Sequence, residues 1–358
     1  MSSILAVGSA SVEEVLHVKN DLKLGGKYTA AARIVGVGGS GVNYTCRLLA
    51  MGQAVYPLLV VGEDPGGDAV VAEIRRSATR GHATCHDIQR VPDATTARTI
   101  IMLDRFGRRT TITVPGHKLE SFGNVVSAAL TRTLGHPIDA VMIGHIPTDH
   151  DGDVTRLILR RFIGEMGNVY ILFNPGRTQY TLGKGGFPKL LERVDCIQFH
   201  VDEAREFLAS GGQYPGRLHF GEMLDALADL CQSAVITFGR LGAVGKKRGA
   251  QGGVLAYPYD VDENILDTTG AGDAFAAGVV ASMTSDANQN RDLRVAMTEG
   301  RLWATYACMK YCGARECPTP MDLKLFERRH QAMQIGEVEE LEAKEFYRLL
   351  RLLERTVD

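Results

Sequence analysis

The chain has 358 residues, which is enough for one large α/β domain or two small ones with a substantial buried core. Its 40 basic and 42 acidic side chains nearly cancel and its aromatic residues are few, so nucleic acid and anionic membrane surfaces are poor candidates for partners. A small uncharged or mildly anionic molecule fits this composition better. The seven cysteines include no CxxC pair, and we expect them to be reduced.

The N-terminal segment starts an apolar run at once and lacks the basic region of a signal peptide. No apolar run approaches the roughly 20 residues that a membrane-spanning helix needs. We therefore expect a cytoplasmic protein that does not bind membranes.

Short runs rich in Val, Ile and Leu alternate with longer segments of helical period along most of the chain. This alternation predicts an α/β fold with a mostly parallel central sheet covered by helices. The predicted strands are residues 4–8, 55–62, 139–144, 169–174, 195–199 and 234–238. The predicted helices are residues 42–51, 67–77, 202–208, 221–231, 270–283 and 293–310.

One stretch departs from this alternation. Residues 98–103 and 110–114 show period-two alternation on either side of a short turn, as a β-hairpin does. Together with a segment around 15–34, they predict a small β lid built from about residues 12–36 and 95–115. An exposed edge of such a lid can pair with a strand of a second copy, so a homodimer is one hypothesis.

The last part of the chain differs in composition from the rest. Residues 321–358 are dense in Glu, Lys and Arg and carry Leu and Phe at helical spacing. They predict a helical appendage that follows a main domain at residues 1–320. Such an appendage either packs on the body of the domain or serves as a helix for a partner.

The strongest chemical signal is residues 267–273, Asp-Thr-Thr-Gly-Ala-Gly-Asp, which lead directly into a predicted helix. Small residues let the backbone approach a ligand, and the free amides at a helix N-terminus attract phosphate oxygens. Asp273 can take the proton of an acceptor hydroxyl while amides of Gly270, Ala271 and Gly272 stabilise a moving phosphoryl group. The alternative is that Asp273 only caps the helix.

A second glycine-rich segment, residues 36–43, reads Gly-Val-Gly-Gly-Ser-Gly-Val-Asn and matches the GxGxxG pattern of dinucleotide-binding folds. Glu63 and Asp64 follow it at a plausible distance for that function. The glycines do not follow the first strand, however, and a second glycine-rich turn lies far downstream. Two such turns, with Asn43 and Asp273, favour a substrate held opposite a triphosphate.

These two segments resemble the signature regions of the ribokinase-like (PfkB-type) carbohydrate kinases, and the resemblance extends from about residue 4 to residue 320. It implies a three-layer α/β sandwich with a β lid, a sugar between lid and sheet, and ATP near the second glycine turn. It also implies that Asp273 is the catalytic base and that Gly270, Ala271 and Gly272 form the anion hole. The implied acceptor-binding residues are Gly38, Gly39 and Asn43.

Other positions match the family less closely. Glu13 stands where the family usually has a substrate-binding Asp, which leaves the identity or pose of the acceptor open. The nucleotide-binding turn of the family resembles the segment with Thr237, Gly239, Arg240 and Gly242. There, Arg240 replaces a commoner small residue.

The metal-binding positions also depart from the family pattern. His200 replaces the Asn of the Asn-x-x-Glu motif that organises Mg²⁺, whereas Glu203 remains; a neutral imidazole can still bond a water of the metal's shell. Asp267, Thr269 and the loop at Gly313 resemble the family's K⁺ site, but Cys317 and Pro318 stand where an oxygen-bearing side chain is wanted. ATP and Mg²⁺ are therefore the implied cofactors, with K⁺ as a weaker inference.

The resulting hypothesis is an ATP-dependent kinase that transfers the γ-phosphoryl group to a hydroxyl of a sugar, with a nucleoside as the close alternative. The competing class is a catalytically impaired relative that binds sugar or nucleotide in a regulatory role. Four arginines of the predicted lid hairpin, at positions 98, 105, 108 and 109, either bind the phosphate of a phosphorylated sugar or simply face solvent. Of these we include Arg98 among the candidate acceptor-binding residues.

Overall fold

The computed structural model describes residues 2–78, 81–83, 88–105, 109–116, 136–147, 149–165, 169–187, 189–210, 218–259, 261, 265–310, 317–331 and 338–357. Its centre is an 11-stranded sheet in the order β15-β14-β13-β12-β11-β10-β9-β1-β4-β5, with β6 also paired to β4. The strands are β1 (Ser3–Val7), β4 (Ala54–Gly62), β5 (His82–Ala83), β6 (Ile88–Val91), β9 (Ala140–Ile143), β10 (Tyr170–Phe173), β11 (Cys196–His200), β12 (Ser233–Thr237), β13 (Ala243–Lys247), β14 (Gly253–Ala256) and β15 (Val338–Leu341).

The six strands predicted from the sequence are all present and pair in parallel, from β4 through β1, β9, β10 and β11 to β12. The prediction missed β13, β14 and β15, which pair antiparallel and extend one edge of the sheet. Two of these strands have four residues and the third contains a glycine and two lysines, so no long apolar run marked them.

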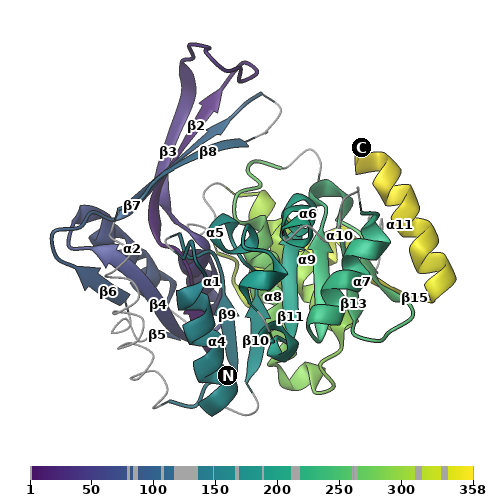
Figure 1. Ribbon diagram of the computed structural model, residues 1–358. Coiled ribbons are helices and arrows are strands. Elements are labelled where there is room, and N and C mark those ends of the chain that lie inside the picture. Colours follow the sequence, from purple (N-terminus) through teal and green to yellow (C-terminus); the bar gives the residue numbers. More distant parts are fainter. Residues whose placement is uncertain are drawn as a thin grey trace.

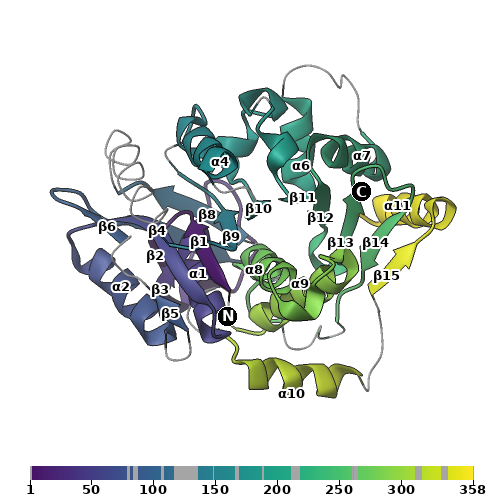
Figure 2. The same cartoon turned by 90° about the horizontal axis from the view of Figure 1, so that it is seen from below.

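Helices cover both faces of the sheet, which gives the three layers that the resemblance implied (Figure 2). Strand β1 shows why two layers form, because Ile4 and Ala6 lie in one core and Leu5 and Val7 lie in the other. The first layer contains α1 (Ser40–Ala50), α2 (Pro65–Ser77), α8 (Ala271–Met283), α9 (Leu293–Cys308) and α10 (Pro320–Gln331). The second contains α4 (Asp153–Glu165), α5 (Arg177–Tyr180), α6 (Val201–Ala209), α7 (Phe220–Leu230) and α11 (Ala343–Val357).

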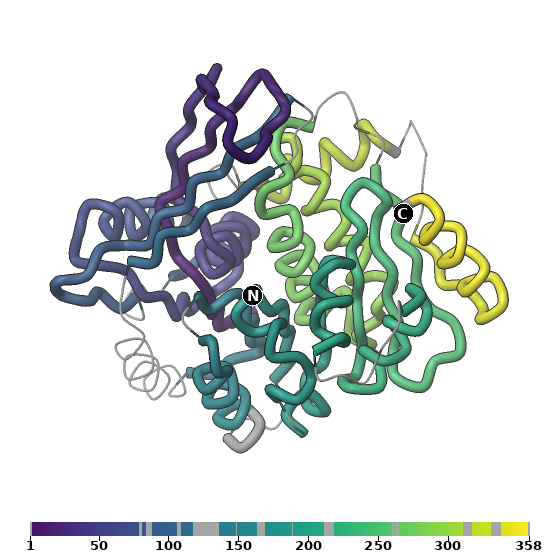
Figure 3. Tube along the Cα trace, turned by 45° about the horizontal axis from the view of Figure 1, so that its top comes forward, coloured from purple at the N-terminus to yellow at the C-terminus, as the bar shows by residue number. Residues whose placement is uncertain are grey.

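A second sheet of four strands, in the order β3-β2-β7-β8, projects from the body as the predicted lid (Figures 1 and 3). Its strands are β2 (Ser11–Val18), β3 (Ala30–Gly38), β7 (Ala97–Leu103) and β8 (Arg109–Val114). The two outer pairs are antiparallel, whereas β2 and β7 are parallel, so segments far apart in the sequence lie side by side. The turn at residues 106–108, which includes Arg108, lies outside the described residues.

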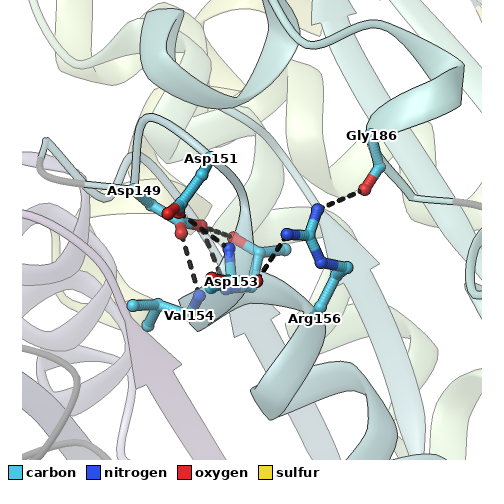
Figure 4. Close-up of polar contacts among 7 residues, drawn as sticks. Asp149, Asp151, Asp153, Val154, Arg156 and Gly186 are labelled. Atoms are coloured by element: carbon cyan, nitrogen blue, oxygen red, sulfur yellow. Dashed lines mark hydrogen bonds and ion pairs between the residues drawn. The ribbon is translucent and has the colours of Figure 1, made fainter.

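The start of α4, a helix that the sequence did not predict, is fixed by a cluster of aspartates (Figure 4). The carboxylate of Asp149, which is fully buried, accepts hydrogen bonds from the backbone N–H groups of Val154 and Thr155 at 2.9 Å each. Arg156 donates to the carbonyl of Gly186 at 2.7 Å and holds the same end of the helix. These bonds satisfy helix-terminal groups, so the cluster has a structural role.

The C-terminal segment is more than a pair of helices. Strand β15 lies between α10 and α11 and pairs antiparallel with β14. Phe346 and Leu350 of α11 are buried in the second core. No helix in the described part of the chain is long and apolar enough to span a membrane.

Candidate active site

The two glycine-rich turns of the sequence meet in space. Helices α1 and α8 begin side by side, and the side-chain Nδ2 of Asn43 donates to Oδ2 of Asp273 at 2.6 Å. These residues are 230 positions apart in the chain. The structure therefore brings together the predicted base and a predicted acceptor-binding residue.

The turn before α8 presents open backbone. Gly270 has a left-handed conformation (φ 74°), and no side chain of this residue caps the helix. A Cβ added at Gly272, which is exposed, would meet no atom within 4 Å. The N–H of Ala271 donates to the carbonyl of Thr268 at 3.2 Å, and the N–H of Ala274 donates to the carbonyl of Gly270 at 2.9 Å. The carboxylate of Asp273 bonds to α1, and the N-terminus of α8 remains a place where an anion is favoured.

Several charges set the pKa of Asp273. Burial raises it, whereas the hydrogen bond from Asn43 and the positive charges of Arg47 and Arg109 lower it. Arg109 belongs to β8, so the charge of a lid arginine lowers the pKa of Asp273. From the sequence, Arg109 is one of the four arginines of the lid hairpin, and its place in the site is a finding of the structure.

Arg98, the arginine that we did assign, lies on the other face of the lid. It pairs with Val12 in the β2–β7 register, while Glu13 pairs with Thr99, so Arg98 and Glu13 point to opposite sides. Arg98 is exposed, and its charge lowers the pKa of Glu14 and Asp64. The structure does not bring it to Asp273.

Glu13, a predicted acceptor-binding residue, is buried. Its Oε1 accepts a hydrogen bond from the backbone N–H of Gly39 at 3.0 Å, and Oε2 is buried with no partner among the described residues. Burial raises the pKa of Glu13 to about 7, the charges of Asp273 and Asp267 add to the rise, and the Gly39 bond opposes it. Near neutral pH this carboxyl group can accept or donate a hydrogen bond to a hydroxyl.

The glycines beside Glu13 are required by close approach. A Cβ at Gly38 would lie 2.2 Å from the Glu13 carboxyl carbon, and one at Gly39 (φ 92°) would lie 2.6 Å from the carbonyl oxygen of Ser9. Gly38 is the last residue of β3 in the lid, so the GxGxxG match does not follow the first strand of a dinucleotide fold. Asp64 caps α2 by accepting from the N–H of Gly67 at 2.8 Å, which gives it a structural role instead of a ribose contact.

His200 and Glu203 lie where β11 runs into α6. The N–H of His200 donates to the Glu203 carboxylate at 2.8 Å, and Nδ1 of His200 accepts from the N–H of Asp202 at 3.4 Å. Burial lowers the pKa of His200, so its imidazole is neutral at pH 7. Burial also raises the pKa of Glu203 to about 7, with a further rise from the nearby charge of Asp273.

The candidate nucleotide turn follows β12. Thr237 pairs with His200 in register, so the carboxyl ends of β11 and β12 lie together at one edge of the sheet. Gly239 (φ 57°) and Gly242 (φ 97°) shape a turn that any Cβ would strain, and a Cβ at Gly242 would lie 2.1 Å from the carbonyl oxygen of Ala256. Arg240 is exposed on this turn.

The residues proposed for a monovalent cation lie beside Asp273. Oδ1 of the buried Asp267 accepts from the N–H of Thr269 at 2.8 Å, while Oγ1 of Thr269 is buried with no partner among the described residues. Gly313 lies outside the described residues, and Cys317 is partly exposed. Within the described ranges, no three His, Cys, Asp or Glu side chains form a group that could hold a metal by themselves.

Sequence reasoning missed a chain of polar residues behind the site. The Tyr44 hydroxyl donates to Asn174 (2.9 Å), Asn174 Nδ2 donates to the carbonyl of Gln198 (3.0 Å), and Gln198 Nε2 donates to the carbonyl of Gly272 (2.9 Å). These bonds link α1, β10 and β11 to the turn of α8. Their signals in the sequence were the polar residue Asn174 directly after the apolar strand β10 and the polar Gln198 in the middle of β11.

Comparison with known proteins places the chain in a family. The sequence pattern of the pfkB family carbohydrate kinases matches residues 1–311. The chain therefore belongs to the pfkB family of carbohydrate kinases.

Among individual proteins, the chain is similar to an ATP-dependent ribose-1-phosphate kinase of Halopiger xanaduensis, with 24% identity over 320 residues, 89% of this chain and 96% of the relative. A nucleoside kinase of Burkholderia thailandensis, in complex with inosine, has a similar structure (TM-score 0.72, 15% identity, 92% of this chain and 99% of that one). So has a ribokinase of Thermotoga maritima (TM-score 0.69, 19% identity, 92% and 100%). These structures share the ribokinase fold with this chain.

Proposed function

We propose that the protein is an ATP-dependent kinase that transfers the γ-phosphoryl group to a hydroxyl of a sugar, with Asp273 as the base. The observation that carries this proposal is the carboxylate of Asp273, bonded to Asn43 at the N-terminus of α8, which no side chain of the N-cap residue Gly270 caps. Asp273 accepts the proton of the acceptor hydroxyl while the oxygen of that hydroxyl forms a bond to the γ-phosphorus. At the same time the bond between the γ-phosphorus and the β-phosphate oxygen of the departing ADP breaks. The amides of Gly270, Ala271 and Gly272 stabilise charge on the moving phosphoryl group.

The remaining site residues take roles that fit their positions. Glu13 and Asn43 bond hydroxyls of the acceptor, and Gly38 and Gly39 let it approach the backbone. The turn after β12 binds the nucleotide through Thr237, Gly239, Arg240 and Gly242.

Glu203 is suited to a Mg²⁺ ion, because that ion is commonly held by one or two carboxylates together with phosphate oxygens and water. The neutral imidazole of His200 does not repel a cation. When bound, Mg²⁺ would neutralise charge on the phosphates of ATP.

A phosphorylated sugar is the acceptor class that we favour. Arg109 lies on the lid face of Glu13, since it pairs with Leu103 and that residue alternates with Thr99. Its charge acts on Asp273 and Glu203, so it can bind an anionic group of the acceptor over the base. The similarity to a ribose-1-phosphate kinase supports the same choice. A nucleoside is the second candidate, favoured by the nucleoside kinases among the similar structures.

Three finer features remain part of the proposal. The buried Oγ1 of Thr269, which has no hydrogen-bond partner in the described part of the chain and lies beside Asp267, suits a K⁺ ion. The outer face of the lid exposes Val35 (43%), Ile112 (50%) and Val114 (53%), which suits packing against a second copy in a homodimer. The need for ATP as a substrate agrees with a cytoplasmic location.

The test is ADP formation with Mg²⁺ and ATP across a panel of sugars, sugar phosphates and nucleosides, with and without K⁺. We expect turnover with a sugar phosphate, and Arg109→Ala should raise its KM at least about tenfold while changing the KM for ATP little. Binding of ATP and sugar without turnover of any acceptor would instead support the impaired, regulatory relative.

A further inference from the structure

Arg47 is a buried arginine that neither glycine-rich motif includes. It lies one turn after Asn43 on α1, and only 2% of its surface is exposed. Moving a guanidinium group out of water is costly unless nearby groups compensate its charge. An apolar side chain would fill the same space without the free-energy cost of removing a charge from water. We therefore expect the charge of Arg47 to have a function.

The contacts of Arg47 lead to the catalytic base. Its Nη1 donates to the carbonyl oxygen of Asn43 at 3.4 Å, and the side chain of Asn43 donates to Asp273 at 2.6 Å. Arg47 and Asn43 are four residues apart, which places them on one face of α1, the face toward α8. Arg47 therefore lies behind the residue that holds the base.

The charges around Arg47 are mostly negative. Glu13, Asp267 and Asp273 gather at this end of α1 and α8, and the negative charges of Asp267 and Asp273 disfavour ionisation of Glu13. Arg47 acts in the opposite direction, because its charge lowers the pKa of both Glu13 and Asp273. The other arginine that acts on Asp273 is Arg109, which is exposed on the lid.

We propose that Arg47 is a positioning residue for the base: it orders Asn43 and supplies the permanent positive charge that keeps Asp273 ionised among the neighbouring carboxylates. The role rests on the proposed function of Asp273. A base must be ionised to accept a proton, and a buried carboxylate beside other carboxylates loses its charge unless a cation compensates. Arg47 provides that cation whether or not the lid covers the site.

A direct measurement is the titration of Asp273 by carbon-13 NMR in protein labelled at the aspartate carboxyl carbons, with the signal assigned from Asp273→Asn. The groups that face Asp273 are Asn43, Tyr44 and Arg47 of α1, Arg109 of the lid, Glu13 of β2 and Glu203 of α6. The variants Arg47→Met and Arg47→Gln remove the charge, and Gln keeps a donor for the Asn43 carbonyl. Arg47→Lys keeps the charge. Arg156→Met, in α4 of the opposite layer, is the matched control for loss of a partly buried arginine.

We expect Arg47→Met and Arg47→Gln to raise the pKa of Asp273 by about one unit or more, whereas Arg47→Lys and Arg156→Met leave it nearly unchanged. If Met fails to give a folded protein, Gln alone decides the outcome. An unchanged pKa in the charge-removing variants would overturn the proposal. This readout needs no turnover, so it stands apart from the test of kinase activity.

Kinetics give a second readout. Loss of the charge should lower kcat/KM more at low pH than at pH 9, by up to about tenfold for a rise of one pKa unit, because the base is ionised in every variant at high pH. A merely structural role would lower kcat/KM by the same factor at every pH, and that result would also overturn the proposal. Absence of turnover in the wild type would refute the proposed function while the NMR titration still reports on Arg47.

Discussion

The proposed acceptor side and the proposed nucleotide side of the site are built in different ways. On the acceptor side, the buried Glu13 accepts a hydrogen bond from Gly39, and the buried Asn43 donates one to the partly exposed Asp273. On the nucleotide side, the turn at residues 239–242 offers backbone in conformations that glycine permits, and Arg240 points into solvent. Substitutions that remove a charge should therefore alter the pH dependence of activity and stability on the acceptor side. Substitutions that add a Cβ atom should have their largest effect on ATP use, where the backbone contacts a phosphate.

The largest effect that we expect is on the acceptor side, from Asp273→Asn. The variant keeps the shape of the side chain but removes the proton acceptor, so kcat should fall by about 10²–10⁴-fold. ATP binding measured by calorimetry should change little, since the amides of α8 stay in place. A variant with near-normal kcat would show that Asp273 is not the base.

The sequence was sufficient to predict the parallel part of the sheet and most of its helices, but not the antiparallel edge of the sheet. The parallel strands and both glycine turns have long, local patterns, and all six predicted strands and six predicted helices are present. The three antiparallel edge strands are short, and nothing in their own residues distinguishes them from loops. The division of the chain at residues 320 and 321 stays a prediction.

Within the candidate site, the sequence motifs include Asn43 and Asp273, which the structure brings together, whereas Arg47, which is connected to them only through tertiary contacts, belongs to no motif. Arg47 is one of several polar residues of α1, and only the meeting of α1 with α8 shows that it lies close to Asp273. The sequence alone did not show that Arg109, and not Arg98, faces Asp273. The face of the lid on which each arginine lies depends on the strand register, which is known only once the strand pairing is known.

A second prediction uses the buried carboxyl group of Glu13. Its folded pKa, about 7, lies above the usual value of 4.5, so the folded state binds the proton more tightly than the unfolded state. The wild type should therefore lose stability as pH rises from about 4.5 to 7, by about 3 kcal/mol. Glu13→Gln should remove this loss, and urea unfolding at pH 5 and pH 8 measures it.

The control for this prediction is Glu14→Gln, the neighbouring residue on the opposite, exposed face of the lid, which is paired with Arg33. Glu14→Gln should not increase the free energy of unfolding at pH 8 relative to the wild type, whereas Glu13→Gln should. A stability difference between wild type and Glu13→Gln that is the same at both pH values would mean that Glu13 does not titrate near neutrality.

A third prediction tests the backbone character of the nucleotide turns. A Cβ at Gly272 meets no atom, so Gly272→Val should fold normally but lower kcat/KM for ATP by about tenfold or more, because the side chain crowds the phosphate. Gly242→Val should instead destabilise the fold, since its Cβ would meet the carbonyl of Ala256 at 2.1 Å. Thermal unfolding and steady-state kinetics separate the two, and unchanged kinetics of Gly272→Val would remove the anion-hole assignment.

The smallest effect should come from His200, the N-cap of α6. Asn is an equal or better N-cap, so His200→Asn should change the free energy of unfolding by no more than about 1 kcal/mol at pH 8. Burial lowers the folded pKa of His200, so below about pH 6.5 the unfolded state binds the proton more readily. The wild type should therefore lose stability relative to His200→Asn as pH falls through that range.

The activity of the wild type should also fall relative to His200→Asn as pH decreases, if the neutral ring supports the metal's water shell, because the imidazolium would repel the cation. If the activities of wild type and His200→Asn decline in parallel at acid pH, and Glu203→Ala is inactive, the metal role belongs to Glu203 alone and His200 is only a helix cap.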